Sequence, residues 1–293
     1  MIGSEVIRTR DGKKLSVSVY KPQEDNNSVL VIGPSLHCTQ DTYRSLANFL
    51  CDHHYTVITF DYRGTGASAG RSLRNDDSRL HQWARLDLDA VLLFVKNNHP
   101  EKEIIFLAHG ISGELSGLAA ASQYISKMVL INSALTCSAL WPLKGRIRKS
   151  IIKVFVPALH FVFGYFPRIK PLSIPRLPRG VMNEWVSWCN SSNGVFELYS
   201  DNNYRKLQVP MLALSFSDDP HSPRRAVAAL LGHFTSAQLT WQHTDPGDHG
   251  LDKVGHTGFF HAQVNNVLWN YLLSWLQERV VSSSPNEPNT VRS

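Results

Sequence analysis

The chain has 293 residues, 43% of them hydrophobic, which is enough for one large α/β domain with an insertion or for two small domains. Its 30 basic and 24 acidic residues leave a net charge of +6, and because no arginine cluster is interleaved with aromatic residues, we expect no binding to nucleic acid. The four cysteines are widely separated, which indicates neither a disulfide framework nor a metal site, and the N-terminus lacks the apolar core of a signal peptide, so we expect a cytoplasmic protein.

Short β-branched runs alternate with segments of helical spacing along most of the chain. Residues 14–22, KLSVSVYKP, alternate with period two and predict an N-terminal antiparallel strand. Further strands are predicted over residues 28–35, 55–64, 103–110, 127–134, 211–219 and 237–244. Helices are predicted over residues 41–54, 80–99, 114–125, 224–234 and 259–280. The repeated order of strand, helix and strand predicts a mostly parallel, doubly wound sheet with helices on both faces.

The alternation stops over residues 138–205, which are rich in aromatic residues, prolines and cations and have no strand pattern. We interpret them as a helical cap inserted between two parts of the core, residues 1–137 and 206–281. Residues 282–293 are polar, and we expect them to form a disordered tail.

The cap contains an apolar run from Ile151 to Phe166 that is interrupted by Lys153, Pro157 and His160. It is too short for a membrane span, which needs about 20 residues. Two interpretations remain: a lid packed on its own domain, or a lid that touches a membrane, since cations precede an aromatic-rich amphipathic stretch.

Unusual residues follow the predicted strands, at the sheet edge where open α/β sheets bind ligands. These segments are GPSLHC at 33–38, DYRGTGAS at 61–68, AHGISG at 108–113, SDDPHSP at 217–223 and VGHTGFF at 254–260. In this order the set resembles the α/β-hydrolase fold, over residues 5–279. Within that fold it resembles a bacterial subfamily of predicted hydrolases of unsettled substrate, which also shows DYRG-G-S, FGYFP, LSF-DD and GH-GFF. The resemblance implies an esterase-like serine hydrolase with an inserted helical cap and a triad in the order nucleophile, acid, histidine.

The resemblance places the triad acid on Asp219, in preference to Asp218, and the histidine on His256. An acid bonded to one imidazole nitrogen fixes the tautomer, so that the other nitrogen can accept the proton of the nucleophile. The donors of the oxyanion hole would be the backbone N–H groups of Leu36 and Ile111.

The nucleophile position departs from the family. Where the family has Gly, His, Ser, any residue, Gly, Gly, this chain has Ala108 to Gly113, with Gly110 in place of the serine. Glycine cannot attack a carbonyl, so covalent catalysis at this position is lost. Because Ala108 and Ser112 also replace family glycines, we favour natural drift over an engineered change. A nucleophile elbow has positive φ, which glycine adopts without strain, so the exchange is expected to leave the fold intact.

Two hypotheses follow for function. In the first, the protein binds a small ester, acyl or other apolar ligand under its cap without turning it over. In the second it is still an enzyme: a hydrolase that uses Ser112 or a water activated by His256, or a cofactor-free lyase with His256 as base. The frame that centres on Ser112 puts Glu114 where a glycine is needed, and the Ser112 side chain should point away from His256. Neither hypothesis calls for a cofactor or metal, and the sequence does not predict an oligomeric state.

Overall fold

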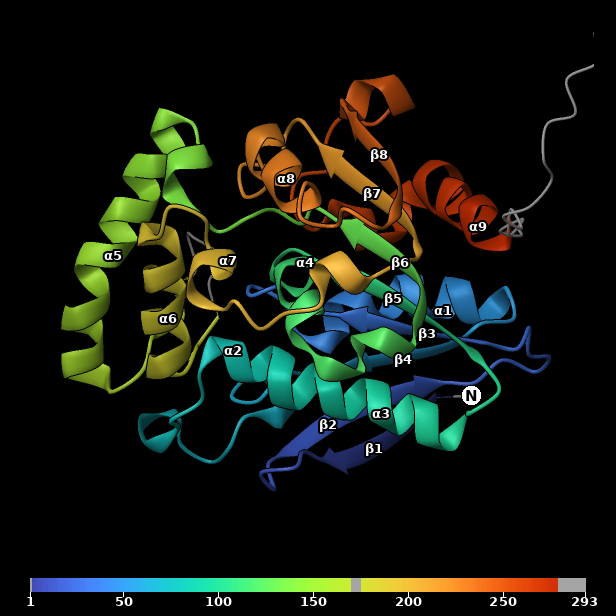
Figure 1. Ribbon diagram of the computed structural model, residues 1–293, viewed down its shortest axis with the longest axis horizontal. Coiled ribbons are helices and arrows are strands. Elements are labelled where there is room, and N and C mark those ends of the chain that lie inside the picture. Colours follow the sequence, from blue (N-terminus) through green and yellow to red (C-terminus); the bar gives the residue numbers. More distant parts are fainter. Residues whose placement is uncertain (1, 170–174, 279–293) are drawn as a thin grey trace, which may run out of the picture.

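The computed structural model describes residues 2–169 and 175–278, so the predicted tail at 282–293 lies outside the described residues. The described part contains an eight-stranded sheet in the order β1-β2-β4-β3-β5-β6-β7-β8 (Figure 1). The strands are β1 Ile2–Arg8, β2 Lys14–Tyr20, β3 Ser28–Gly33, β4 Thr56–Phe60, β5 Glu103–His109, β6 Ile125–Ile131, β7 Pro210–Phe216 and β8 Gln238–Thr244. β1 and β2 pair antiparallel with each other and β2 pairs antiparallel with β4, whereas the strands from β4 to β8 are parallel. The predicted mostly parallel sheet is confirmed, and β1 is an additional strand.

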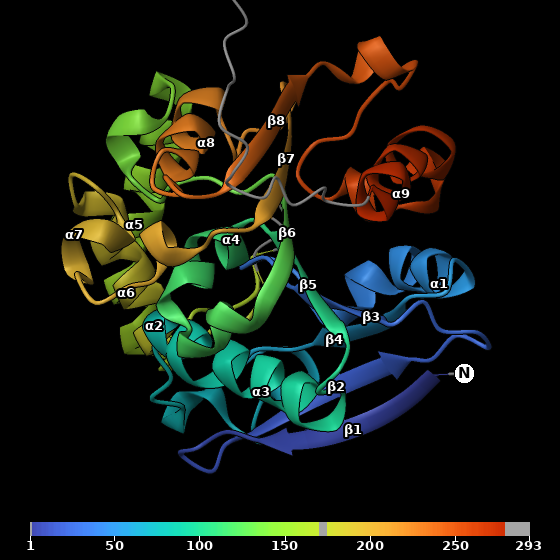
Figure 2. The same ribbon diagram turned by 45° about the vertical axis from the view of Figure 1, so that its right-hand side comes forward.

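Helices cover both faces of the sheet, as predicted (Figure 2). One face carries α1 Arg44–Asp52 and α9 Asn270–Gln277, and the other carries α2 Leu80–Gln82, α3 Asp89–Asn98, α4 Ile111–Leu115 and α8 Arg224–Leu231. Each face has its own cluster of buried apolar side chains, because the central parallel strands are apolar on both sides.

Two predicted helices are shorter than expected. The helix predicted over 114–125 is α4 followed by 3-10 turns, in which the Ser116 and Ser122 hydroxyls donate to carbonyls three residues earlier and compete with helical bonding. The helix predicted over 259–280 becomes regular only at α9 and is preceded by short helical turns. There the Trp269 indole donates to the Phe259 carbonyl at 2.6 Å, which binds these turns to the start of the segment.

Between β6 and β7 the chain forms α5 Leu143–Phe163, α6 Arg179–Asn190 and α7 Val195–Leu198. Both views show α5 and α6 side by side, beyond the ends of the central strands (Figures 1 and 2). Val156 of α5 is buried in the apolar cluster that also contains residues of β5 and α4, so this helix packs on its own domain. No helix in the described ranges is both long enough and apolar enough to cross a membrane.

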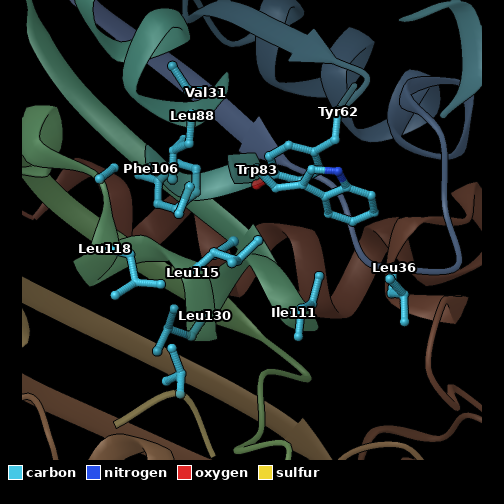
Figure 3. Close-up of a cluster of buried hydrophobic side chains, with 14 of the residues drawn as sticks. Val31, Leu36, Tyr62, Trp83, Leu88, Phe106, Ile111, Leu115, Leu118 and Leu130 are labelled. Atoms are coloured by element: carbon cyan, nitrogen blue, oxygen red, sulfur yellow. The ribbon is translucent and has the colours of Figure 1, made fainter. Parts of the chain in front are cut away.

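The carboxyl end of β5 is held by a dense apolar cluster. Figure 3 shows Ile111 and Leu115 of α4 directed into the cluster that contains Phe106 of β5 and Leu130 of β6. Burying a side chain of this size contributes about 1.5–3 kcal/mol relative to leaving it exposed. The elements on either side of the turn, β5 and α4, are therefore both held by apolar packing, which fixes the backbone of the turn between them.

Candidate active site

Gly110 forms the sharp turn between β5 and α4. Its φ of 54° and ψ of −118° confirm the predicted positive φ. Its N–H donates to the Ile131 carbonyl of β6 at 3.0 Å, which ties the turn to the sheet. A Cβ at this position would lie 3.1 Å from Nε2 of His256, so the turn faces the predicted histidine. The backbone of a nucleophile elbow is present here without the hydroxyl.

Asp219 and His256 form a close pair. Asp219 Oδ2 lies 2.8 Å from Nδ1 of His256, and the same carboxylate accepts from the Ser222 hydroxyl and the His221 N–H. Burial alone would raise the pKa of Asp219, but the charge of His256 and these hydrogen bonds lower it to about 2. The carboxylate is therefore ionised at neutral pH, and it orients His256 so that Nε2 faces the turn at Gly110.

Asp218 holds the backbone of the histidine loop and does not bind the imidazole. Its Oδ2 accepts from the N–H groups of Val254 and Gly255 at 2.9 and 2.8 Å. The Asn132 amide donates to the carbonyls of Gly255 and His256 at 2.9 and 3.1 Å. Of the two adjacent aspartates, Asp219 is the one that contacts the His256 imidazole.

A chain of buried hydrogen bonds connects the loops that carry Ser35 and His256. The Ser35 N–H donates to the Tyr43 hydroxyl at 2.9 Å, and that hydroxyl lies 2.8 Å from Nδ1 of His109. Burial raises the pKa of Tyr43, so the phenol stays protonated and its O–H donates a hydrogen bond to Nδ1 of His109. Nε2 of His109 then donates to the His256 carbonyl at 2.9 Å. His109 is the last residue of β5, and it links the Ser35 and His256 loops without lining the cavity.

Ser35 is a site residue that the sequence reasoning missed. Its Oγ lies 3.0 Å from Nε2 of His256 and only 2.5 Å from the position that a Cβ on Gly110 would take. The segment GPSLHC was singled out for the backbone N–H of Leu36, while the hydroxyl beside it was not considered. Its place at the end of a central strand was the feature that could have identified it.

Ser112 lies in the core behind the turn. It is fully buried, and its hydroxyl donates to the Pro34 carbonyl at 2.7 Å and contacts the Tyr62 hydroxyl at 2.8 Å. These bonds hold the loop that carries Ser35. In this orientation Ser112 makes no hydrogen bond to His256.

The two predicted oxyanion donors, Leu36 and Ile111, line the same cavity as His256. Ile111 is the first residue of α4, where a helix N–H has no partner within the helix. Leu36 follows Ser35 in the chain, just as Ile111 follows Gly110. Their N–H groups are donors of the type that stabilises a developing oxyanion, although this role remains a prediction.

The cavity of about 80 Å³ lies between the turn at Gly110 and the cap. Its apolar walls include Ile111, Ala134, Trp141, Ile152, Met182 and Trp185. Arg148 and Lys149 of α5 also line it, and none of the described lining residues carries a carboxylate. Lys149 Nζ lies 3.0 Å from the centroid of the Trp141 ring, and burial lowers the pKa of Lys149 to about 8. The cavity is therefore apolar with a cationic edge.

Two further histidines, His37 and His221, lie around His256 at the cavity wall. Their ring centroids are 5.0 Å apart, and that of His221 is 5.0 Å from that of His256. Burial lowers the pKa of His37 and brings that of His221 to about 3, with the charge of His256 adding to both shifts. These rings are therefore neutral at physiological pH. Within the part of the chain that the structure describes, no three His, Cys, Asp or Glu side chains are placed to hold a metal ion.

A model of the alpha/beta hydrolase family matches residues 33–264, most of the chain and all of the site. The chain belongs to this family. Among solved structures that resemble this alpha/beta hydrolase, the hydrolase GrgF from Penicillium sp. sh18 has 16% identity and a TM-score of 0.63, over 94% of this chain and 98% of GrgF. The esterase Pf2001 from Pyrococcus furiosus has 16% identity and a TM-score of 0.62, over 94% of this chain and 91% of Pf2001.

The esterase EaEST from Exiguobacterium antarcticum has 15% identity to this family member and a TM-score of 0.58, over 94% of this chain and 100% of EaEST. At these identities the likeness shows the fold alone. No curated protein sequence was found to match the chain. The resemblance to one bacterial subfamily stays a prediction.

Proposed function

We propose that this alpha/beta hydrolase binds a small ester or acyl ligand beneath its cap, and that Gly110 closes the family's usual covalent route at the elbow. The observation that carries the proposal is the cavity that joins Gly110, His256 and α5 in one apolar space. Ligand sites are typically apolar clefts with a few convergent polar groups, and Ser35 and His256 supply such groups here. The cationic edge favours ligands whose acyl chain ends in a carboxylate.

The proposal is tested by calorimetric titration with N-phenylbutanamide, an uncharged amide that resembles a short acyl ester. Ala134→Leu fills the cavity, and we expect it to weaken binding about tenfold, or about 1.4 kcal/mol. Ala139→Leu is the matched control, because Ala139 is exposed and lies outside the cavity lining. Wild-type protein that does not bind the amide, or equal losses in the two variants, would contradict the proposal.

We also propose that the outer face of α5 contacts an anionic membrane surface. Exposed apolar side chains recur there at helical spacing: Leu143, Ile147, Ile151, Val154, Phe155 and Phe161. Three of the five lysines and arginines of α5, Lys144, Arg146 and Lys153, lie outside the cavity lining, and the helix has no acidic residue. Apolar area combined with cations is the pattern of an interfacial helix, and it complements an anionic lipid surface.

Flotation with vesicles tests this second proposal. We expect binding to phosphatidylglycerol vesicles, weaker binding to phosphatidylcholine vesicles, and loss of binding in Phe155→Ser/Phe161→Ser. Leu239→Ser is the control, because Leu239 is an exposed apolar residue of β8. Concentration-dependent dimerisation that the double substitution abolishes, without vesicle binding, would instead assign the face to a second copy of the chain.

A further inference from the structure

The hydroxyl missing from the elbow has a close substitute on a neighbouring loop. Ser35 follows β3, the strand beside β5, and its Oγ lies 2.5 Å from the position that a Cβ on Gly110 would take. At 3.0 Å from Nε2 of His256, it is within the range of a nucleophile–base hydrogen bond. His256 is in turn oriented by Asp219 at 2.8 Å. A hydroxyl, an imidazole and the carboxylate that orients it are thus in contact, and the hydroxyl comes from the loop after a different strand.

The position of Ser35 is fixed by its surroundings. Its N–H is bound by Tyr43, which connects through His109 to the backbone of His256, so the nucleophile and the base share one buried support. The Ser112 hydroxyl holds the carbonyl of the preceding residue, Pro34. A hydroxyl that is held in this way is already oriented toward its base before a ligand arrives.

The backbone at Ser35 also avoids the strain of an elbow. Among the described residues other than glycine, positive φ occurs at Asn27, His54 and Asn132, so Ser35 is outside that conformation. Leu36 is the residue after Ser35, and Leu36 and Ile111 line the same cavity. The two residues whose N–H groups were expected as donors for an elbow serine therefore line the cavity that Ser35 also lines.

We propose that Ser35 is the catalytic nucleophile of this protein and acts on an ester bound under the cap, a role that rests on the proposed ligand class. Ser35 Oγ forms a bond to the carbonyl carbon while its proton passes to Nε2 of His256, and the charge that develops on the carbonyl oxygen is met by the N–H groups of Leu36 and Ile111. The ester C–O bond then breaks, and the alcohol leaves with the proton from His256. Water, activated by His256, hydrolyses the acyl-Ser35 and restores the hydroxyl.

The test is intact-mass labelling with an alkyl fluorophosphonate, followed by peptide mapping. In this reaction the Ser35 O–P bond forms, the P–F bond breaks, fluoride leaves and the proton goes to His256. We expect one phosphonyl group on the wild-type protein at Ser35, none on Ser35→Ala, and labelling at least tenfold slower in Asp219→Asn. Ser116→Ala is the matched control, because Ser116 is a buried serine of the same region outside the cavity lining. Thermal melts establish that each variant is folded.

Three outcomes would overturn the assignment. The first is labelling at another residue, Ser112 included. The second is an unlabelled wild-type protein beside a labelled Gly110→Ser/Ser35→Ala variant, which would make Ser35 a space-filling residue on an intact scaffold. The third is an unlabelled wild-type protein that binds N-phenylbutanamide normally, in which case the proposed ligand pocket stands and Ser35 is not a nucleophile. Loss of both labelling and amide binding would remove the two proposals together.

Discussion

Two features disfavour a side chain at Gly110. Its backbone has positive φ, and Ser35 lies close to the position that a Cβ would take. A non-glycine residue at positive φ costs about 1–3 kcal/mol. At Gly110 there is also a contact, because a new Cβ would lie 2.5 Å from Ser35 Oγ. Restoring a serine here would therefore disturb the hydroxyl that already contacts His256.

We predict that Gly110→Ala lowers the free energy of unfolding more than Gly12→Ala does, by at least about 1 kcal/mol. Gly12 is the matched control, because its φ is 81° and nothing lies within 4 Å of a Cβ added there. The difference between the two variants therefore measures the close contacts of a Cβ at Gly110, which are Ser35 Oγ at 2.5 Å and His256 Nε2 at 3.1 Å, with the cost of positive φ present in both. Urea unfolding gives both values.

The contact can be isolated by a double-mutant cycle. Ser35→Gly removes the opposing hydroxyl, so it should recover most of the excess cost of Gly110→Ala, with a coupling energy of about 0.5–3 kcal/mol. If the costs at Gly110 and Gly12 are equal, or if Ser35→Gly recovers nothing, the contact is not what excludes a side chain from the turn.

At the scale of elements, the sequence predicted seven of the eight described strands along the chain and the loops that carry Asp219 and His256. This was possible because buried parallel strands are continuous apolar runs and their ends are marked by glycine, proline and polar residues. Ser35 escaped prediction because its role depends on the packing of two loops 221 residues apart in the chain, Ser35 against His256. A local sequence pattern does not predict a contact between residues that far apart in the chain. The short α4 escaped for a different reason that is local: the Ser116 and Ser122 hydroxyls compete for backbone carbonyls three residues earlier.

Helix α5 contributes the cationic edge of the cavity, and this edge should select among acyl ligands. We predict that N-phenylsuccinamate, which carries a terminal carboxylate, binds at least about tenfold more tightly than N-phenylbutanamide at pH 7. Because burial lowers the pKa of Lys149 to about 8, its charge is lost as pH rises through that value. The preference for the carboxylate should therefore shrink above pH 8, as calorimetric titration of both amides can show.

Lys149→Met should reduce that preference at pH 7 and remove its change near pH 8. Lys153→Met is the control on the same helix, because the exposed contact of Lys153 with Asn190 lies outside the cavity lining. Equal affinities of the wild-type protein for the two amides would show that the cationic edge does not contact the ligand.

At the scale of the whole molecule, the buried histidines around His256 link stability to pH. Burial lowers the pKa values of His37, His109 and His221, and that of His221 falls to about 3. The unfolded chain protonates these side chains below about pH 6.5, whereas the folded protein leaves them neutral. Between these values the unfolded state binds more protons, so stability rises with pH there and is lost as pH falls.

Asp219 affects stability at lower pH than the histidines do. Its pKa in the folded protein is about 2 against an ordinary value of 3.8, so the stability that it contributes is complete above that ordinary value and is lost as pH falls toward 2. Burial raises the pKa of Asp87 and of Glu114 to about 7, so these two carboxyls add stability as pH falls from 7 toward 4 and oppose the histidines. A net loss of stability that begins near pH 6.5 therefore points to histidines, and a change confined to pH values below about 4 would come from carboxylates such as Asp219.

We predict that the free energy of unfolding falls steadily from pH 6.5 to pH 4 and that His221→Asn reduces this slope by up to about 1.4 kcal/mol per pH unit, the contribution of one proton. Urea unfolding at several pH values measures the slope. His261→Asn is the control, because His261 is exposed. Of the two substituted histidines, only His221 belongs to the group around His256. Equal changes of the slope in His221→Asn and His261→Asn would therefore show that the acid sensitivity does not arise from that group.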